Sequence, residues 1–169
     1  MAYKVVDISS IQNHKIKELI RLRESKERRK RGAFLVEGER EVRRAFEAGY
    51  QVVSIFIKAE FKSPDLKKMI AALMSASDVR TVFQLSNVTY SKVGVRDSTE
   101  EIIAVFKKRK ILLKHLELPK KPVVVLIDGV EKPGNIGAIL RSCDGAGVDL
   151  VVIVGDASDE YSPIATWSS

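Results

Sequence analysis

The sequence predicts an α/β protein in two parts, each with helices packed on a mostly parallel sheet. Short runs of β-branched and other apolar residues alternate with segments whose apolar residues recur at helical spacing. That alternation is typical of parallel strands joined by helices. A basic stretch that ends in Pro119 and Pro122, residues 107–121, divides the pattern. We therefore expect one α/β/α domain over residues 1–106, a linker over 107–121, and the start of a second α/β unit over 122–169.

The first part begins with a predicted helix from Asn13 to about Lys30, because Asn13 is a good N-cap and Gly32 follows the last helical residue. A second helix start is Ser63-Pro64-Asp65, which combines a cap, a proline at the first position and an acid in the first turn. Apolar runs predict strands at 34–36, 52–57, 80–85 and 101–106, and helical spacing predicts further helices at 39–48 and 87–92.

The second part opens with an uninterrupted apolar strand, Val123–Ile127, and a similar strand follows at Val151–Val154. A helix between them is expected to begin at Asn135 as N-cap. Its buried stripe should be formed by residues at positions i, i+3, i+4 and i+7, namely Ile136, Ile139, Leu140 and Cys143. In parallel sheets ligands bind beyond the carboxyl ends of strands, which here are residues 128–135 and 155–156.

The composition describes a water-soluble chain without metal or disulfide chemistry. The 169 residues contain one cysteine, Cys143, which excludes an internal disulfide and leaves a cysteine-based zinc site without a ligand set. We expect Cys143 to be a core residue. No apolar run approaches the ~18 residues that a membrane span needs, and the N-terminus lacks the apolar core of a signal peptide. A cytoplasmic location with no membrane partner is the expectation.

The net charge of +7 favours a polyanionic partner. Basic residues gather between residues 21 and 31 and again over the linker, 107–121. The ordinary interpretation of such clusters is a solvated helix face, and an interfacial membrane helix would need an opposing aromatic-rich apolar face that neither segment has. Because the residues are clustered and the chain is basic, we nevertheless expect the first cluster to contact nucleic acid. Its members are Arg21, Arg23, Lys26, Arg28, Arg29, Lys30 and Arg31.

The helix predicted between the two strands of the second part carries Gly137 and Arg141 on one face, beside the buried stripe. Asp144 lies one turn further. Three interpretations are open. Arg141 forms a surface ion pair with Glu131 or Asp144. Alternatively the turn binds a dinucleotide, although its two glycines, at 134 and 137, do not give the G-x-G-x-x-G spacing. The third interpretation is an RNA-modifying site that uses Arg141.

The motif favours the third interpretation. Glu131-x-Pro133-x-Asn135-x-Gly137-x-x-x-Arg141, with Gly147, resembles the first signature of the SpoU (TrmH-like) branch of the SPOUT RNA methyltransferases. Residues 13–17 and 34–39 are similar to the substrate-binding domain of the same family, which has a ribosomal-protein α/β/α fold that binds RNA. The resemblance covers nearly the whole chain. It implies a trefoil-knotted catalytic domain that moves a methyl group from S-adenosylmethionine to a ribose 2'-hydroxyl.

Carried over residue by residue, the resemblance implies catalytic positions at Arg141 and Asn135, and a turn-supporting position at Glu131. In the family the arginine helps to position or activate the ribose hydroxyl. The physical reason is that a fixed cation stabilises the alkoxide that develops on a poor nucleophile.

The resemblance also predicts what lies outside the printed residues. The later signatures of the family, which form the knot around S-adenosylmethionine and most of the dimer interface, have no counterpart up to Ser169, and Trp167 stands where the family has an arginine. The expectation is a chain cut within its catalytic domain, with the cofactor site beyond Ser169 and the family's homodimer in doubt. Two functions therefore remain open: an RNA 2'-O-methyltransferase, acting on structured RNA and preferably ribosomal RNA, or a non-catalytic RNA-binding module.

Overall fold

The protein is described by a computed structural model that covers residues 3–94, 100–109, 116–155 and 159–163. It divides into two compact units, Met1–Lys108 and Arg109–Ser169. The expected end of the first domain, at residue 106, and the expected start of the second, at residue 122, lie on either side of this division. Each unit is an α/β structure, as the sequence predicts, and each is considered by itself.

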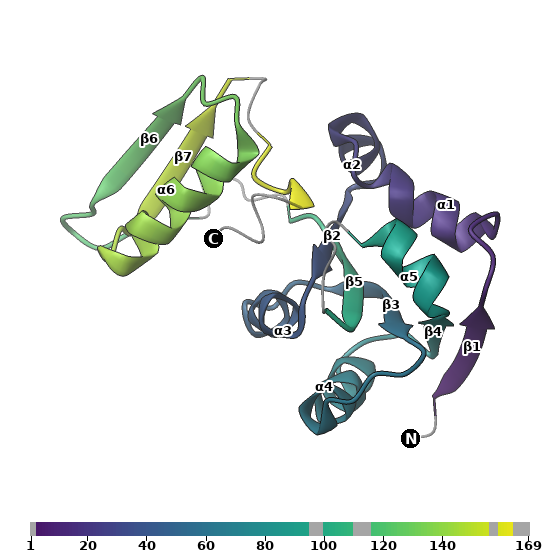
Figure 1. The fold of residues 1–169 in the computed structure, drawn as a ribbon. Coiled ribbons are helices and arrows are strands. Elements are labelled where there is room, and N and C mark those ends of the chain that lie inside the picture. The colour runs from purple at the N-terminus through teal and green to yellow at the C-terminus, as the bar shows by residue number, and fades with distance from the viewer. Residues whose placement is uncertain (1–2, 95–99, 110–115, 156–158, 164–169) are drawn as a thin grey trace. The chain divides into compact units, whose positions relative to one another are not determined.

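The N-terminal unit is a five-stranded sheet between two layers of helices (Figure 1). The strand order is β1-β4-β3-β5-β2. Helices α1 and α5 pack on one face of the sheet and helices α3 and α4 pack together on the other (Figure 1). The elements, in chain order, are β1 (Lys4–Ile8), α1 (His14–Arg21), α2 (Ser25–Arg31), β2 (Ala33–Glu37), α3 (Glu39–Glu47), β3 (Val52–Lys58), α4 (Pro64–Ser75), β4 (Thr81–Leu85), α5 (Asn87–Val93) and β5 (Ile102–Lys107).

The prediction of a mostly parallel sheet is correct for one half of this unit and wrong for the other. Strands β1, β4 and β3 pair in parallel, but β5 is antiparallel to both β3 and β2. Helix α5 lies between β4 and β5 in chain order, but β5 still runs antiparallel to β3, so a helix in the connection does not by itself make the next strand parallel. Strand β1 was not predicted, because it is an edge strand with only Ile8 fully buried and shows little apolar pattern.

The first predicted helix is two helices. The Asn13 cap is confirmed, since its side chain accepts a hydrogen bond of 2.9 Å from the Lys15 N–H. The helix ends at Arg21, however, and Glu24 has an extended backbone before α2 begins. The break is held by Arg28, whose Nη1 donates to the Leu22 carbonyl over 2.7 Å. Gly32 ends α2 in the left-handed conformation, φ 58°, as expected.

The core of the N-terminal unit fills both faces of the sheet. On the α1/α5 face, Ile16 and Leu19 of α1 pack with Tyr90 and Val93 of α5 over the strands. On the other face the α4 side chains Leu66, Ile70 and Leu73 are fully buried, as their helical spacing predicts. The cap at Ser63 is also confirmed, since its hydroxyl accepts a hydrogen bond of 3.2 Å from the Leu66 N–H.

The C-terminal unit contains one β-α-β element (Figure 1). Strands β6 (Val124–Asp128) and β7 (Leu150–Val154) pair in parallel, and α6 (Pro133–Gly145) connects them. Ile136 and Cys143 are buried, which confirms Cys143 as a core residue, whereas Ile139 and Leu140 are half-buried. The outer side chains of β6 are exposed; Leu126, for example, is 64% exposed.

Candidate functional site

The predicted catalytic residues all lie on the loop after β6 and on α6. Glu131 is in the loop, Asn135 is in the first turn of α6, and Arg141 is in its middle; all three are exposed. Trp167 lies outside the described residues. The structure therefore places the three residues in one β-α-β element, with Glu131 and Asn135 following the carboxyl end of β6 and Arg141 further along α6.

The helix begins earlier than the sequence predicts. Lys132, not Asn135, is the N-cap, and Pro133 is the first helical residue. Proline fits this position because its fixed φ is helical and its missing N–H would have no intrahelical partner. The Asn135 N–H donates to the Lys132 carbonyl over 3.0 Å, so Asn135 is the third residue of the helix.

The carboxyl ends of the two strands lie against each other. Gly155, directly after β7, has φ 94°, and a Cβ added there would lie 3.6 Å from the Gly129 nitrogen and 3.8 Å from the Asp128 Oδ1. A Cβ at Gly155 would make only ordinary van der Waals contacts with the neighbouring loop, so the positive φ is what favours glycine at this position. This edge is where a parallel β-α-β unit presents residues to a ligand.

Arg141 and Asn135 leave α6 in different directions. They are six residues apart, which in an α-helix is about 9 Å along the axis and about 120° around it. Arg141 instead shares a face with Gly137, one turn earlier. Gly137 is buried, so Arg141 lies at the border between the covered and the open sides of the helix.

A cavity of about 370 Å³ lies between β6 and α6, but it does not fit S-adenosylmethionine. Its walls are the side chains of Val125, Ala138, Ile139, Ser142, Cys143, Ala146 and Val148. The only hydroxyl among them, on Ser142, donates to the Ala138 carbonyl over 3.1 Å. The cavity thus offers no charged group for the sulfonium, carboxylate or amino group of the cofactor. No described residue is assigned to the methyl donor.

Two arginines of the basic cluster hold the fold. Arg28 is 3% exposed and binds the Leu22 carbonyl within the α1–α2 connection. Arg23 donates through Nη2 to the Val93 carbonyl over 2.5 Å and to the Gly94 carbonyl, at the end of α5. A cation at a helix C-terminus satisfies carbonyls that lack an intrahelical partner. The guanidinium groups of Arg23 and Arg28 are directed at carbonyls within the unit, which argues against the RNA-binding role predicted for these two residues.

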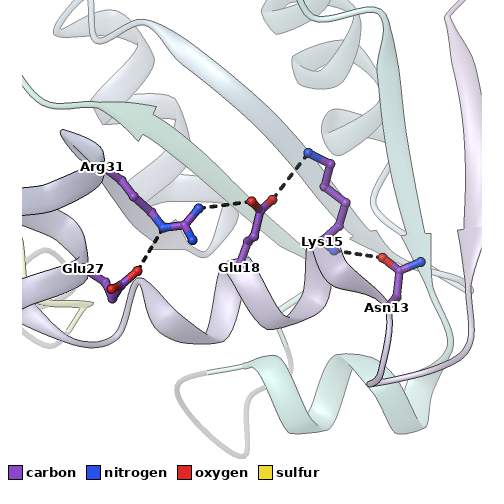
Figure 2. A network of polar contacts seen from close by, with 5 residues as sticks. All are labelled: Asn13, Lys15, Glu18, Glu27 and Arg31. Atoms are coloured by element: carbon purple, nitrogen blue, oxygen red, sulfur yellow. Dashed lines mark hydrogen bonds and ion pairs between the residues drawn. The ribbon is translucent and has the colours of Figure 1, made fainter.

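Arg31 belongs to an ion-pair network between α1 and α2 (Figure 2). Its Nε donates to Glu27 Oε2 and its Nη1 to Glu18 Oε1, each over 3.1 Å, and Lys15 Nζ lies 3.5 Å from the other Glu18 oxygen. Partial burial raises the pKa of Glu18, but hydrogen bonds from Arg31 and Lys15 outweigh it, and the net shift is downward. Glu27 also has a lowered pKa, because of its hydrogen bond from Arg31. Sequence analysis missed Lys15 and Glu18, although their i, i+3 spacing is a recognisable ion-pair signal.

The remaining basic residues of the cluster form an exposed surface. Lys26, Arg29 and Lys30 lie at positions i, i+3 and i+4 of α2 and are exposed; Arg21, at the end of α1, is exposed too. We call these four residues the basic face. Arg29 hydrogen-bonds Ser25 within its own helix, at 3.1 Å from Nη2, and keeps its charge at the surface. Arg23 is exposed as well, but its guanidinium donates to carbonyls at the end of α5, so it is not counted in the basic face.

The part of the chain that the structure describes contains neither a cluster of metal ligands nor a membrane-spanning helix. Those residues contain no group of three or more histidine, cysteine, aspartate or glutamate side chains able to hold a metal ion. No helix within them is long and apolar enough to cross a bilayer.

Comparison with protein families gives two matches in succession. Residues 13–104 match the MRM3-like substrate binding domain. Residues 122–169 match the SpoU rRNA Methylase family. The matched ranges fall in the N-terminal and C-terminal units, respectively.

Individual relatives and solved structures agree with these matches. The chain is 31% identical over 156 residues to the 23S rRNA (guanosine(2553)-2'-O)-methyltransferase RlmP of Bacillus subtilis, covering 92% of this chain and 57% of the relative. A crystal structure of an RNA 2'-O ribose methyltransferase is 32% identical, with a TM-score of 0.80 over 96% of this chain and 60% of its own. The SpoU methyltransferase AviRb of Streptomyces viridochromogenes, crystallised with AdoMet, is 25% identical, with a TM-score of 0.81 over 93% of this chain and 58% of its own. The chain thus spans somewhat more than half the length of each.

Proposed function

Because this chain belongs to the SpoU methyltransferase family, with an MRM3-like substrate-binding domain before its SpoU segment, we propose that the protein methylates a ribose 2'-hydroxyl of ribosomal RNA. The domain division that we propose is residues 1–106 for RNA binding, 107–121 as linker and 122–169 for the first part of the methyltransferase domain. Two of the relatives named above are RNA 2'-O-methyltransferases, one of them for 23S rRNA.

The observation that carries the proposal is the place of Arg141. It is exposed on α6, one turn above a buried glycine, in a β-α-β unit whose two strand ends meet at Gly129 and Gly155. Arg141 lies eight residues beyond the start of α6, and we propose that its long side chain contacts the ribose. Glu131 and Asn135 lie at the start of the same helix and are proposed to hold the turn and to orient the substrate.

The proposed reaction needs a positioned nucleophile. The ribose 2'-oxygen attacks the methyl carbon, an O–C bond forms, the bond from sulfur to methyl breaks, and the hydroxyl proton passes to solvent or a base. S-adenosylmethionine supplies the electrophilic methyl group when it is bound. The part of Arg141 is to hold the hydroxyl and to stabilise negative charge that grows on its oxygen, a type of contribution that changes rates by about 10²–10³-fold in other enzymes.

The partners follow from the same proposal. The substrate is structured RNA, preferably ribosomal RNA, and the methyl donor is S-adenosylmethionine, with which a relative was crystallised. A homodimer and a cytoplasmic location, where ribosomes are made and used, belong to the proposal as well. It applies to a protein in which these residues occur together with the rest of the SpoU domain.

The experiment is methyl transfer to 23S rRNA by such a protein. The RNA is incubated with S-adenosylmethionine, digested to nucleosides and analysed by mass spectrometry. We expect one additional methyl group, on a ribose. A methyl group on a base, or none on RNA from several sources, would refute the proposed reaction.

A second candidate is an RNA-binding module without catalysis, which the exposed basic face alone supports. The two candidates differ in Arg141. A binding module should retain its full function with alanine there, whereas the methyltransferase should retain RNA affinity and lose methyl transfer.

A further inference from the structure

The N-terminal unit contains a second cavity, of about 390 Å³, where α1 and the end of α2 meet the sheet. Leu19, Leu22, Phe56 and Val105 form its apolar wall and also belong to the core of the unit. Pockets that hold small planar ligands have this size and this mixture of an apolar wall with a few polar groups. The cavity lies wholly within the N-terminal unit.

A β-bulge opens the strand side of this cavity. The pairing of β3 with β5 passes from Val52–Phe106 to Ser54–Val105, so Val53 is an extra residue without a partner on β5. Consecutive strand residues normally face opposite sides of a sheet, but here Val53 and Ser54 both line the cavity. Val53 remains 51% exposed. The cavity therefore offers an accessible apolar surface beside a hydroxyl.

The helix side of the cavity carries Lys15, Glu18 and Arg31, the network of Figure 2. Glu18 from α1 and Glu27 from α2 hold the Arg31 guanidinium at two different nitrogens. Its plane is thereby fixed before any ligand arrives, which reduces the entropy lost on binding. A planar guanidinium stacks well on the flat face of a nucleobase.

The charge around the cavity favours a nucleic acid over an apolar ligand. The lining carries Lys15 and Arg31 against one carboxylate, Glu18, and Lys30 of the basic face directly precedes Arg31 in α2. Phosphates on either side of a bound nucleotide would meet these cations. RNA is recognised in this way when an unstacked base enters an apolar site and its backbone follows a basic surface.

We propose that the cavity lined by Val53, Ser54 and Arg31 binds one unpaired base of the RNA substrate, while the basic face binds the adjoining phosphates. The proposal rests on the proposed function, because it assumes that RNA is the substrate. It names a site on the N-terminal unit, separate from the Arg141 helix in the sequence and in its role.

The test compares two neutral substitutions at exposed valines. Val53→Gln places a long polar side chain in the cavity mouth, and Val88→Gln makes the same change on α5, at a valine that is 71% exposed and does not line the cavity. Affinity of the full chain for a fluorescein-labelled fragment of ribosomal RNA, a hairpin with unpaired loop bases, is measured by anisotropy at several salt concentrations. We expect Val53→Gln to weaken binding about tenfold, as for loss of one stacked base, with an unchanged salt slope, and Val88→Gln to bind like the wild type. Equal affinities of the two variants would overturn the proposal.

A second pair of measurements separates this proposal from the proposed function. Arg31→Lys keeps the charge but not the planar group, so we expect weaker binding with the same salt slope. RNA carrying 4-thiouridine should crosslink to residues of the cavity, whereas crosslinks confined to other surfaces would contradict base binding there. If RNA binds with undiminished affinity to Val53→Gln and Arg31→Lys, only the cavity proposal fails; if no RNA binds to the wild type, the proposed function fails too.

Discussion

At the scale of single residues, the arginines and lysines of one basic cluster have different tasks. Arg28 is buried and binds a backbone carbonyl, Arg31 joins two helices through carboxylates, and Lys26 and Lys30 face solvent. Sequence shows only the sum of these charges. Burial and hydrogen bonding decide which of them are free to attract RNA.

Replacing Arg28 should therefore affect stability more than RNA binding. Arg28→Ala leaves the Leu22 carbonyl without this donor inside the unit, which costs about 1–3 kcal/mol. Arg29→Ala, at the neighbouring exposed position, should change the free energy of unfolding by less than about 0.5 kcal/mol. Urea denaturation of both variants measures the difference. If Arg28→Ala is as stable as Arg29→Ala, the structural role assigned to Arg28 is wrong.

Replacing Arg141 should affect catalysis and not folding. Arg141 is exposed, so Arg141→Ala should unfold at the same temperature as the wild type. We expect its kcat for methyl transfer to fall about 10²–10³-fold, and Arg141→Lys to recover only part of the loss, because an ammonium group presents its donors differently. A kcat of Arg141→Ala within a few-fold of the wild type would remove this residue from the mechanism.

At the scale of elements, the sequence predicts what is buried and misses what is held by tertiary contacts. Periodicity located α4 with its Ser63 cap, and it identified Cys143 as a core residue, because burial itself creates the pattern. The α1–α2 break was missed because a long-range arginine contact, from Arg28 to Leu22, stabilises it. The reversed direction of β5 could not be read from its composition, since β5 is as apolar as a parallel strand.

The candidate site shows the same limits. The motif predicted the loop and helix that carry Glu131 and Arg141, but placed the start of that helix at Asn135 and not at Pro133. A cap and a first-turn residue look alike in sequence, because both are small and polar. The cavity beside Val53 had no sequence signal at all, since it depends on a one-residue bulge in the pairing of β3 with β5.

The link between α1 and α2 should depend on pH. The pKa of Glu18 is lowered from its ordinary value of 4.5, so its ion pairs stabilise the folded state above about pH 4.5, and this contribution is lost as the pH falls through the lower folded-state pKa. Glu18 is 41% exposed at its side chain, so the contribution is below about 1 kcal/mol. We expect wild type to be more stable than Glu18→Gln at neutral pH, and the difference to vanish in acid. A difference in unfolding free energy that is the same at neutral and acid pH would contradict this account.

At the scale of the whole molecule, we propose that the two units have separate tasks. The N-terminal unit supplies the basic face, and the C-terminal unit supplies Arg141. RNA should be bound mainly by the first and methylated through the second. Substitutions in the two units should consequently change different kinetic constants.

The most direct measurement of this division is the steady-state kinetics of RNA methylation. Lys26→Glu with Lys30→Glu reverses two charges of the basic face, and Lys67→Glu with Lys68→Glu on α4 makes the same change at two exposed lysines elsewhere. We predict that the first pair raises the KM for RNA and leaves kcat unchanged, that the α4 pair changes both constants little, and that Arg141→Ala lowers kcat. If reversal of the basic face leaves KM at the value of the α4 control, or lowers kcat as Arg141→Ala does, the proposed division between an RNA-binding unit and a methyl-transfer unit is wrong.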